Sequence, residues 1–373
     1  MTRVVISGYY GFANAGDEAM LAAIVGSLKD IIPDVDITVI TGNCRMTREN
    51  HKVQAVHRLN FFAIAAAIRR CDILISGGGS LLQDVTSARS LHYYLWIMKI
   101  ALFFKKPVML YAQGIGPVRG IKARKAVQQV AVIGVRDRES KAELSDMGVT
   151  RPPIHVTADA VLSMHPVDKA IGRQILERHG FTGSRRKVGI AVRNWQGHQA
   201  YKDAIAEAAD RLQQQEDVDI IFIPMQHPED VDAGRDIADR MKRAAIVLDD
   251  RYSTVEFMSL MGCMDAVIAN RLHALIFSAL METPATAISY DPKIDSFIHL
   301  IGDRVCGTTE SVTAEALASR VSQQLAQGGL APAIKARLNH LRRQSLRNAY
   351  LALRILEGRD GVRKRLEQHR RSL

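Results

Sequence analysis

Short apolar runs alternate with longer amphipathic stretches through residues 1–330. The short runs have the length of buried strands, and the longer stretches repeat apolar residues at helical spacing. The first series of predicted strands is Val4–Ser7, Asp36–Ile40, Ile73–Ser76, Val108–Ala112, Ala131–Val135 and Ile154–Thr157. The second series is Val188–Val192, Ile220–Ile223, Ala245–Leu248, Ala266–Ala269 and Ala285–Ile288. This alternation predicts parallel sheets with helices on both faces.

The amphipathic stretches predict the connecting helices. They are Asp17–Leu28, Leu91–Phe104, Ala123–Ala131, Val167–His179, Ala204–Gln213, Pro228–Arg243, Val255–Met261 and Leu272–Met281. A polar turn between the two series places a hinge near residues 160–185. We therefore expect an α/β protein with two Rossmann-like, doubly wound domains, 1–165 and 166–330, and a helical segment, 331–373. In such sheets ligands bind at the carboxyl ends of the strands, so we expect a cleft between facing domains to hold the site.

Length and composition agree with two globular domains. The 373 residues are 47% hydrophobic and 24% charged, and no apolar run reaches the length of a membrane span. The chain opens on a strand, which predicts no signal peptide. Four scattered cysteines without a CxxC pair predict neither a disulfide framework nor a metal site, and they favour a cytoplasmic protein.

The positive charge is concentrated at the C-terminus. From Lys335 onward, twelve Lys and Arg residues face three acidic ones, so nine of the eleven net positive charges lie there. Apolar residues at helical spacing predict an amphipathic helix, broken near Gly358 and Gly361. Such a helix can dock on the body with a solvated basic face, or bind an anionic membrane through residues 335–373. Tyr350 is its one aromatic residue, so base stacking is poorly supported and we expect no nucleic acid partner.

Glycine-rich loops follow three strands of the first series. The loop Ser7–Glu18 permits a close backbone approach, with Asn14 and Asp17 as capping residues or ligand contacts. It lacks the GxGxxG fingerprint, which argues against a nicotinamide enzyme. Ser76–Ser80 brings bare amides to the predicted cleft, and Gln113–Pro117 lines the same edge or forms only a turn. The candidate contacts from these loops are Asn14, Asp17, Gly78, Gly79, Ser80 and Gln113.

Basic residues follow strands in both halves. Arg136 and Arg138 follow one strand, where neighbouring acids could neutralise them, and Arg193 follows another. The most informative stretch joins a strand to a helix, where Arg271 and His273 flank one apolar residue. A helix N-terminus already favours an anion, although a buried structural histidine is the common alternative. Lys293 follows the next strand and could reach the same ligand, so the cations together predict a multiply charged anion.

Five of these motifs, in this order, resemble the polysaccharide pyruvyl transferases, with similarity to bacterial members that modify secondary cell-wall polymer precursors for S-layer anchoring. The motifs are GYYGFANAGDE from Gly8, SGGGS from Ser76, QGIGP from Gln113, VRDRES from Val135 and NRLHA from Asn270. The resemblance runs from residue 1 to about 330 and does not include the tail. It implies a glycosyltransferase-B-like fold and a pyruvate ketal as product.

The resemblance also implies phosphoenolpyruvate as donor, with no further cofactor and no metal. The resemblance implies that Arg271, His273 and Lys293 hold this donor, with either Arg136 or Arg138 as a further candidate. Arg193 is expected to face the same donor from its position at a strand end. His273 is the expected acid or phosphate anchor, and Asp17 from the other half is the expected base. The acceptor is expected to be a sugar on a lipid diphosphate, which would bring a cytoplasmic enzyme to the inner face of the plasma membrane.

Two other functions fit the same predicted fold. A glycosyltransferase with a nucleotide-sugar donor would need a carboxylate on the ribose, for which Glu256 is a candidate. A non-enzymatic sugar-phosphate-binding or lipid-surface scaffold would release no phosphate from phosphoenolpyruvate.

Overall fold

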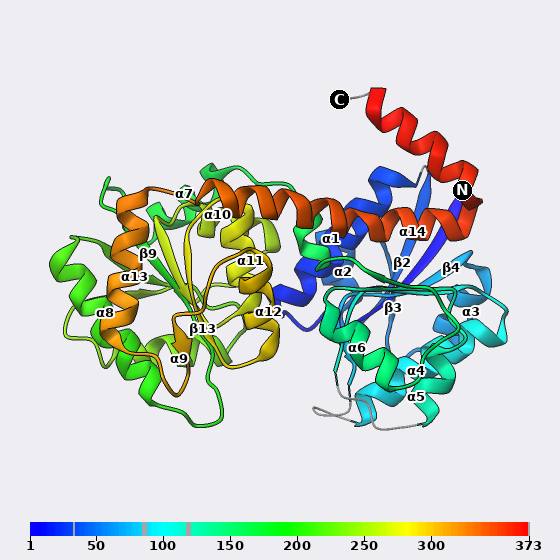
Figure 1. The fold of residues 1–373 in the computed structure, drawn as a ribbon, viewed down its shortest axis with the longest axis horizontal. Helices are drawn as coiled ribbons and strands as arrows, with labels where there is room; N and C mark the ends of the chain where they lie inside the picture. The colour runs from blue at the N-terminus through cyan, green and yellow to red at the C-terminus, as the bar shows by residue number, and fades with distance from the viewer. Residues whose placement is uncertain (33, 84–87, 117–120, 372–373) are drawn as a thin grey trace. The chain divides into compact units, whose positions relative to one another are not determined.

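Two parallel β-sheets with flanking helices make up the protein (Figure 1). The computed structural model describes all residues except 33, 84–87, 117–120 and 372–373. For residues 88, 121, 122, 364–366 and 368–371 it describes the backbone but not the side chain. The chain divides into unit 1, residues 1–13, 17–164 and 341–373, and unit 2, residues 14–16 and 165–340. The sequence placed the boundary after residue 165 and treated 331–373 as a separate segment, whereas the structure shares the last helix between the units.

Unit 1 contains an eight-stranded sheet. Its strands are β1 (Thr2–Ser7), β2 (Val35–Thr41), β3 (Gln54–His57), β4 (Ile73–Ser76), β5 (Gly79–Leu82), β6 (Val108–Ile115), β7 (Val132–Val135) and β8 (Ile154–Val156). Its helical elements are α1 (Ala15–Ile31, whose first two residues belong to unit 2), α2 (Cys44–His51), α3 (Phe61–Arg70), α4 (Ala88–Phe103), α5 (Ile121–Val127), α6 (Arg138–Asp146) and the short 3-10 helix η1 (Ala160–Ser163).

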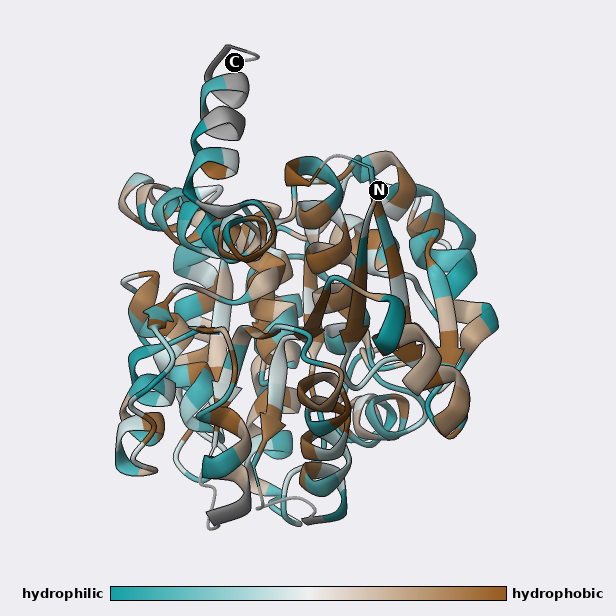
Figure 2. Ribbon diagram, turned by 90° about the vertical axis from the view of Figure 1, so that its right-hand side faces the viewer, coloured by the Kyte–Doolittle hydropathy of each residue, from teal (hydrophilic) through white to brown (hydrophobic). Residues whose placement is uncertain are grey.

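The sheet of unit 1 separates two hydrophobic cores. The strands run in the order β3-β2-β1-β4-β6-β7-β8, with β5 paired to β6, and every pair is parallel. Apolar residues of α3, α4, α5 and α6 fill one core, and those of α1 and the C-terminal helix fill the other. Figure 2 shows the strands largely in the brown of hydrophobic residues, as burial on both faces requires.

Unit 2 contains a six-stranded parallel sheet, in the order β11-β10-β9-β12-β13-β14. The strands are β9 (Lys187–Ala191), β10 (Asp219–Phe222), β11 (Ile246–Val247), β12 (Ala266–Ala269), β13 (Ala285–Ser289) and β14 (Gly307–Thr308). The helices are α7 (Lys169–Arg178), α8 (Ala200–Gln215), α9 (Glu229–Ala238), α10 (Thr254–Gly262), α11 (Leu272–Leu280), α12 (Pro292–Leu300) and α13 (Ala314–Gln327). This strand order is that of a Rossmann fold, which confirms the predicted fold class.

Two glycine-rich segments predicted as loops contain strands. β6 continues through Ile115, although Ala112 has a φ of 48° and the pairing with β7 shifts register beyond Leu110. The buried side chain of Asn348 accepts the Ala112 N–H at 3.3 Å. This hydrogen bond satisfies a backbone donor where the pairing of β6 with β7 is irregular. The φ of 93° at Gly79 turns the chain so that β5 runs beside β6. Pro117, the end of the predicted turn, lies outside the described residues.

Two predicted helices are too long. The stretch Ala123–Ala131 corresponds to α5, which ends at Val127, and Pro228–Arg243 corresponds to α9, which ends at Ala238. An apolar residue follows each helix, Val130 after α5 and Met241 after α9; Val130 is buried and Met241 is half-buried, but neither extends the helix before it. Helix boundaries are set by local hydrogen bonds, which periodicity does not report.

The C-terminal helix α14 (Pro332–Arg371) docks its apolar stripe on protein. Its residues 332–340 belong to unit 2 and the rest to unit 1, where Leu341, Ala349 and Leu353 are buried. Gly358 has a φ of 73° and ψ of −166° and interrupts the helix, as predicted, while residue 361 is helical again. Among the described residues, no helix combines the length and apolar character needed to cross a membrane.

Candidate functional site

The candidate site of unit 2 lies where four parallel strands end. β9 has β10 on one side and β12 on the other, so the chain changes winding direction between β9 and β12. Ligands of doubly wound sheets bind at this switch point, outside the carboxyl ends of the strands. Arg193 follows β9, Asp230 follows β10, Arg271 and His273 follow β12, and Lys293 follows β13.

Arg193 is positioned through its backbone. The side chain of Asn270 is fully buried; its Oδ1 accepts the Arg193 N–H at 2.8 Å, and its Nδ2 donates to the Arg193 carbonyl at 3.2 Å. The guanidinium lies over the rings of Trp195 and Tyr290, at 5.8 and 5.7 Å from their centroids. Its Nε is buried and has no hydrogen-bond partner among the residues that the structure describes. A buried cationic donor without a partner is costly, so this Nε is a candidate contact for an anionic ligand.

Arg271 is held by a buried carboxylate. Its Nε donates to Asp230 Oδ2 at 2.8 Å, and its Nη2 donates to Asp230 Oδ1 and, at 3.2 Å, to Gln226 Oε1. The Asp230 side chain is fully buried and that of Arg271 is 12% exposed. Burial raises the pKa of Asp230, and the Arg271 guanidinium partly offsets this effect. The fork fixes the orientation of Arg271 and neutralises much of its charge.

His273 lies in the first turn of α11. The N-cap of this helix is Arg271, which makes no side-chain capping hydrogen bond, so its first amides are not capped by that residue. Gly16, from the segment 14–16 that belongs to unit 2, lies against the imidazole, because a Cβ there would be 2.2 Å from His273 Nδ1. The ring therefore lies beside a position where only glycine fits.

Lys293 is the remaining predicted cation of this unit. Its Nζ lies 3.0 Å from Asp291 Oδ2, and 6.0 Å from the centroid of the Tyr290 ring that also contacts Arg193. Asp291 caps α12 by accepting the Lys293 N–H, so the turn that carries this lysine is fixed at the end of β13. Tyr290 thus lies beside two predicted donor-binding residues.

Asn14 lies with these residues rather than with the other predicted acceptor contacts. It forms an isolated bridge with Gln226, and its Nδ2 donates to Gln226 Oε1 at 3.3 Å, the same oxygen that accepts from Arg271. Its Oδ1 accepts the Gly16 N–H at 3.0 Å. Asn14 therefore helps to order the Arg271 and His273 surroundings within unit 2.

The remaining predicted residues lie in unit 1, at the carboxyl ends of β1, β4, β6 and β7. Gln113 is fully buried, and its amide donates to the carbonyls of Gly77 at 3.0 Å and Gly79 at 3.5 Å. Gln113 thus holds the glycine turn through its carbonyl groups. A Cβ at Gly77 would lie 2.0 Å from the hydroxyl of the buried Tyr10, and one at Gly78 would lie 3.1 Å from Met20 Sδ. A side chain at Gly77 would therefore require Tyr10 to move, whereas one at Gly78 would make a tight contact with Met20.

Arg136 and Arg138 have different surroundings. The side chain of Arg136 is 11% exposed; its Nη2 donates to Ser80 Oγ at 3.3 Å, and it pairs with Asp137 at 3.2 Å and Asp159 at 3.7 Å. Arg138 is exposed in the first turn of α6. Arg136 is therefore the one of the two that lies at the glycine-rich edge.

Asp17 lies near the same turn, in the first turn of α1. A Cβ at Gly79 would be 3.7 Å from its Oδ1. Its carboxylate adds to the effect of burial in raising the pKa of Tyr10. Its neighbour Glu18 is buried and bonds to Gly11 N–H and His51 Nε2, at 2.8 and 2.9 Å, so Glu18 orders the loop.

Sequence reasoning missed several residues that build the site. Asp230 and Gln226 contact Arg271 but come from another loop, and only the adjacency of strand ends could have suggested them. Asn270 lies in the NRLHA motif, but its contact with the backbone of Arg193 was not anticipated. In unit 1, the guanidinium of Arg58 lies over Phe12 and Tyr93, at 5.2 and 5.1 Å. Within the described ranges, no three His, Cys, Asp or Glu side chains form a metal-binding group.

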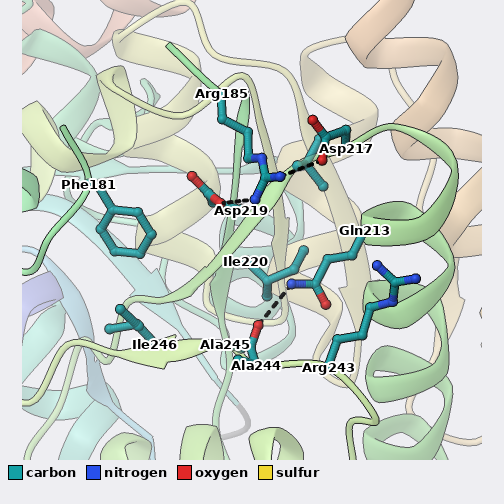
Figure 3. Close-up of a pocket in the computed structure, with 11 residues that line it drawn as sticks. Phe181, Arg185, Gln213, Asp217, Asp219, Ile220, Arg243, Ala244, Ala245 and Ile246 are labelled. Carbon is teal, nitrogen blue, oxygen red and sulfur yellow. Dashed lines mark hydrogen bonds and ion pairs between the residues drawn. The ribbon is translucent and has the colours of Figure 1, made fainter. Parts of the chain in front are cut away.

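One cavity of about 440 Å³ lies at the other edge of the unit 2 sheet (Figure 3). Arg185 in its wall pairs with Asp217 and Asp219, at 2.6 and 3.3 Å, and Gln213 donates to the Ala244 carbonyl. These residues lie at the amino ends of β9 and β10, so the cavity is separate from the site of the predicted cations.

Comparisons with known proteins bear on family and fold. The family model described as polysaccharide pyruvyl transferase matches residues 14–292, about three quarters of the chain. A search of curated proteins found no match.

Similar solved structures include S. aureus MnaA with UDP, at 10% identity and a TM-score of 0.65, covering 95% of this chain and 96% of that one. E. coli ADP-heptose LPS heptosyltransferase II has 16% identity and a TM-score of 0.57, with coverage of 88% and 99%. A glycosyltransferase from Rickettsia africae has 14% identity and a TM-score of 0.59, with coverage of 99% and 98%. At these identities the likeness shows the fold alone, which is glycosyltransferase-B-like.

Proposed function

The chain belongs to the polysaccharide pyruvyl transferase family, whose members transfer pyruvate onto polysaccharide, and from that premise we propose that its donor is phosphoenolpyruvate and its product a pyruvate ketal. The acceptor in this proposal is a sugar of a cell-wall polysaccharide precursor carried on a lipid diphosphate. The secondary cell-wall polymers that anchor S-layers are the proposed destination. The enzyme would then work in the cytoplasm, at the inner face of the plasma membrane.

The buried Nε of Arg193 is the observation that best supports an anionic donor. It lacks a partner among the described residues, and it lies at the switch point beside the start of α11. A phosphate or carboxylate oxygen placed there would accept from Arg193 and from the first amides of α11. Lys293, which lies beside the same Tyr290 ring as Arg193, supplies a second cation. Phosphoenolpyruvate, with a phosphate and a carboxylate close together, matches this arrangement.

In the proposed reaction a proton adds to the methylene carbon of the donor. The adjacent carbon becomes electrophilic, and a sugar hydroxyl forms a C–O bond to it and loses its proton. Phosphate then leaves with its C–O electron pair, and a second hydroxyl closes the ketal. The two hydroxyl protons balance the one added to carbon and the one carried by phosphate. His273 is proposed as the acid, since imidazole titrates near neutrality, and Asp17 as the base.

The glycine-rich edge of unit 1 is the proposed acceptor site. Backbone groups at Gly78 and Gly79 can approach sugar hydroxyls closely because no side chains intervene. Ser80 and Arg136 are bonded to each other at this edge and add polar groups. Asn14 is proposed to act on the donor side through Gln226 and Arg271, and Gln113 acts by holding the glycine turn.

Phosphoenolpyruvate should stabilise the protein against thermal unfolding. At a hundred times its Kd it should add about 2.7 kcal/mol, which corresponds to about 5 °C or more in Tm. Arg193→Gln should remove most of this shift, because it removes the guanidinium whose buried Nε lacks a hydrogen-bond partner among the described residues. The matched control is Arg185→Gln, at the opposite end of β9, which should keep the shift. Stabilisation by UDP-sugars and not by phosphoenolpyruvate would favour a glycosyltransferase instead.

Glu256, the candidate ribose carboxylate of that alternative, has another partner. Its side chain accepts the Ser253 N–H at 2.7 Å and completes the capping box at the start of α10. The Glu256 carboxylate is therefore engaged in capping α10, which argues against this residue as a ribose contact.

Gly16→Ala should lower pyruvate transfer about a hundredfold, because the added methyl would displace His273. Phosphate release from phosphoenolpyruvate in the presence of a sugar acceptor measures the effect. The control is Gly26→Ala in the same helix, where a Cβ would meet no atom within 4 Å. That change should keep activity and stabilise α1 by up to about 1 kcal/mol. Full activity of Gly16→Ala would show that the position of the imidazole is unimportant.

A further inference from the structure

Unit 1 exposes five large apolar side chains on and beside α3 and α4, here called the α3–α4 surface. The exposed fractions are 63% for Leu59, 49% for Phe61, 92% for Phe62, 37% for Trp96 and 80% for Phe103. The two helices contact each other through Phe61 and Trp96, whose ring centroids are 5.0 Å apart at an angle of 85°. Trp96 and Phe103 are seven residues apart on α4, so they lie on the same side of that helix.

These exposed side chains are not needed for the core. Ile64 and Ile68 of α3, with Leu95 and Met98 of α4, already supply the buried faces that pack on the sheet. Exposing single apolar residues is ordinary, but a group of aromatic side chains on adjoining helices marks an interaction site.

The charge around this surface is mostly positive, with the exposed Asp72 just after α3 as an acidic neighbour. Neither α3 nor α4 contains an acidic residue. Exposed basic residues lie on both helices and just after α4; they are Arg69, Arg70, Arg89, Lys99 and Lys105. Basic residues combined with Trp, Phe and Leu are the composition of helices that lie in the interface of an anionic membrane. A soluble partner would have to match this charge with a row of acids, whereas an anionic bilayer offers negative charge everywhere.

We propose that the α3–α4 surface attaches the protein to an anionic lipid bilayer, with Phe62 and Phe103 entering the headgroup region. This goes beyond the proposed reaction, and the attachment itself does not depend on it. The aromatic surface continues toward the glycine-rich edge of the same unit. Arg58 lies over Tyr93 of α4 and over Phe12, and Phe12 stacks on Tyr9 at 4.3 Å in the loop after β1. A sugar on a lipid carrier would meet that edge next to the membrane.

The α3–α4 surface is a different membrane contact from the basic segment 335–373 that the charge distribution suggested. The basic helix α14 packs into the core formed with α1, whereas α3 and α4 pack into the core on the opposite face of the unit 1 sheet (Figure 1). The apolar residues of α14 that could enter a bilayer, such as Leu341 and Leu353, are buried in unit 1. Variants of the α3–α4 surface and of α14 can therefore distinguish which of the two contacts a membrane.

The test is co-sedimentation of the full chain with vesicles of phosphatidylcholine containing about a third phosphatidylglycerol. The double variant Phe62→Ser, Phe103→Ser should bind at least about tenfold more weakly, because two exposed apolar anchors are removed. A second double variant, Lys99→Gln with Lys105→Gln, should also bind the vesicles more weakly than the parent, and its binding should depend less on salt. The matched control is Val255→Ser with Leu300→Ser, which replaces two exposed apolar residues of unit 2 and should bind like the parent.

Three results would overturn the proposal. The first is absence of vesicle binding by the parent chain, or unchanged binding by the double variant. The second is loss of binding on deletion of residues 358–373 alone, which would assign the contact to the tail. The third is a change from dimer to monomer in the double variant with vesicle binding unaffected, which would assign the surface to a second copy. Transfer to a soluble sugar acceptor should be the same in parent and double variant, so failure of the proposed reaction is recognised separately.

Discussion

His273→Ala should lower the rate of pyruvate transfer by about 10² to 10⁴-fold, the usual contribution of a positioned acid or base. The proposed reaction needs a proton delivered to carbon, and His273 lies at the start of α11 beside the proposed phosphate position. The rate is measured as phosphate released from phosphoenolpyruvate with a sugar acceptor. The unfolding midpoint should change little, since the ring lies beside Gly16 at the sheet edge.

The control for this variant is His299→Ala. His299 is exposed in the last turn of α12, and its removal should leave both transfer and stability unchanged. Full activity of His273→Ala would remove this residue from the reaction and leave the acid unassigned.

Asp230→Ala should lower the free energy of unfolding of unit 2 by about 3–5 kcal/mol. The carboxylate is fully buried and forked onto Arg271, so its removal leaves a mostly buried guanidinium whose Nη2 still donates to Gln226 Oε1. Denaturant unfolding followed by circular dichroism measures this loss. Transfer should also fall, because Arg271 would no longer be held at the end of β12.

The control is Asp232→Ala, two residues later on α9, where the side chain is exposed. Its unfolding free energy should stay within about 0.5 kcal/mol of the parent. Replacing the pair by apolar residues, Asp230→Leu with Arg271→Met, should recover much of the lost stability without recovering transfer. If Asp230→Ala unfolds like the parent, the fork does not stabilise unit 2.

Much of the site follows from strand order and local motifs. Arg193, Arg271 and Lys293 each come directly after an apolar run, and in a parallel sheet such ends share one edge. The structure brings Arg193 and Lys293 to the same tyrosine ring, Tyr290, as that reasoning anticipates. The glycine-rich turn after β4 likewise lies at the edge that the sequence predicts.

The partners of these residues could not be predicted in the same way. Asp230 pairs with Arg271 across 41 residues of sequence, and Asn14 reaches Gln226 across 212. A periodic pattern indicates which face of a helix is buried, but it does not indicate which two buried side chains contact each other. Gln113 shows the same limit. It follows the predicted strand Val108–Ala112, which suggested a ligand contact, but in the structure it is buried within β6 and its amide holds the glycine turn.

The sequence by itself determined the two doubly wound units, the strand ends that carry the chemistry and the concentration of charge in the C-terminal helix. These features depend on neighbours along the chain, where hydrophobic period and loop composition are sufficient. Only the tertiary structure decided that Arg271 pairs with Asp230 and that the buried Nε of Arg193 has no hydrogen-bond partner among the described residues. It also decided that α14 buries its apolar stripe, while α3 and α4 carry exposed aromatic residues in addition to their buried faces. Those outcomes depend on which surfaces meet, and burial is a property of the packed chain.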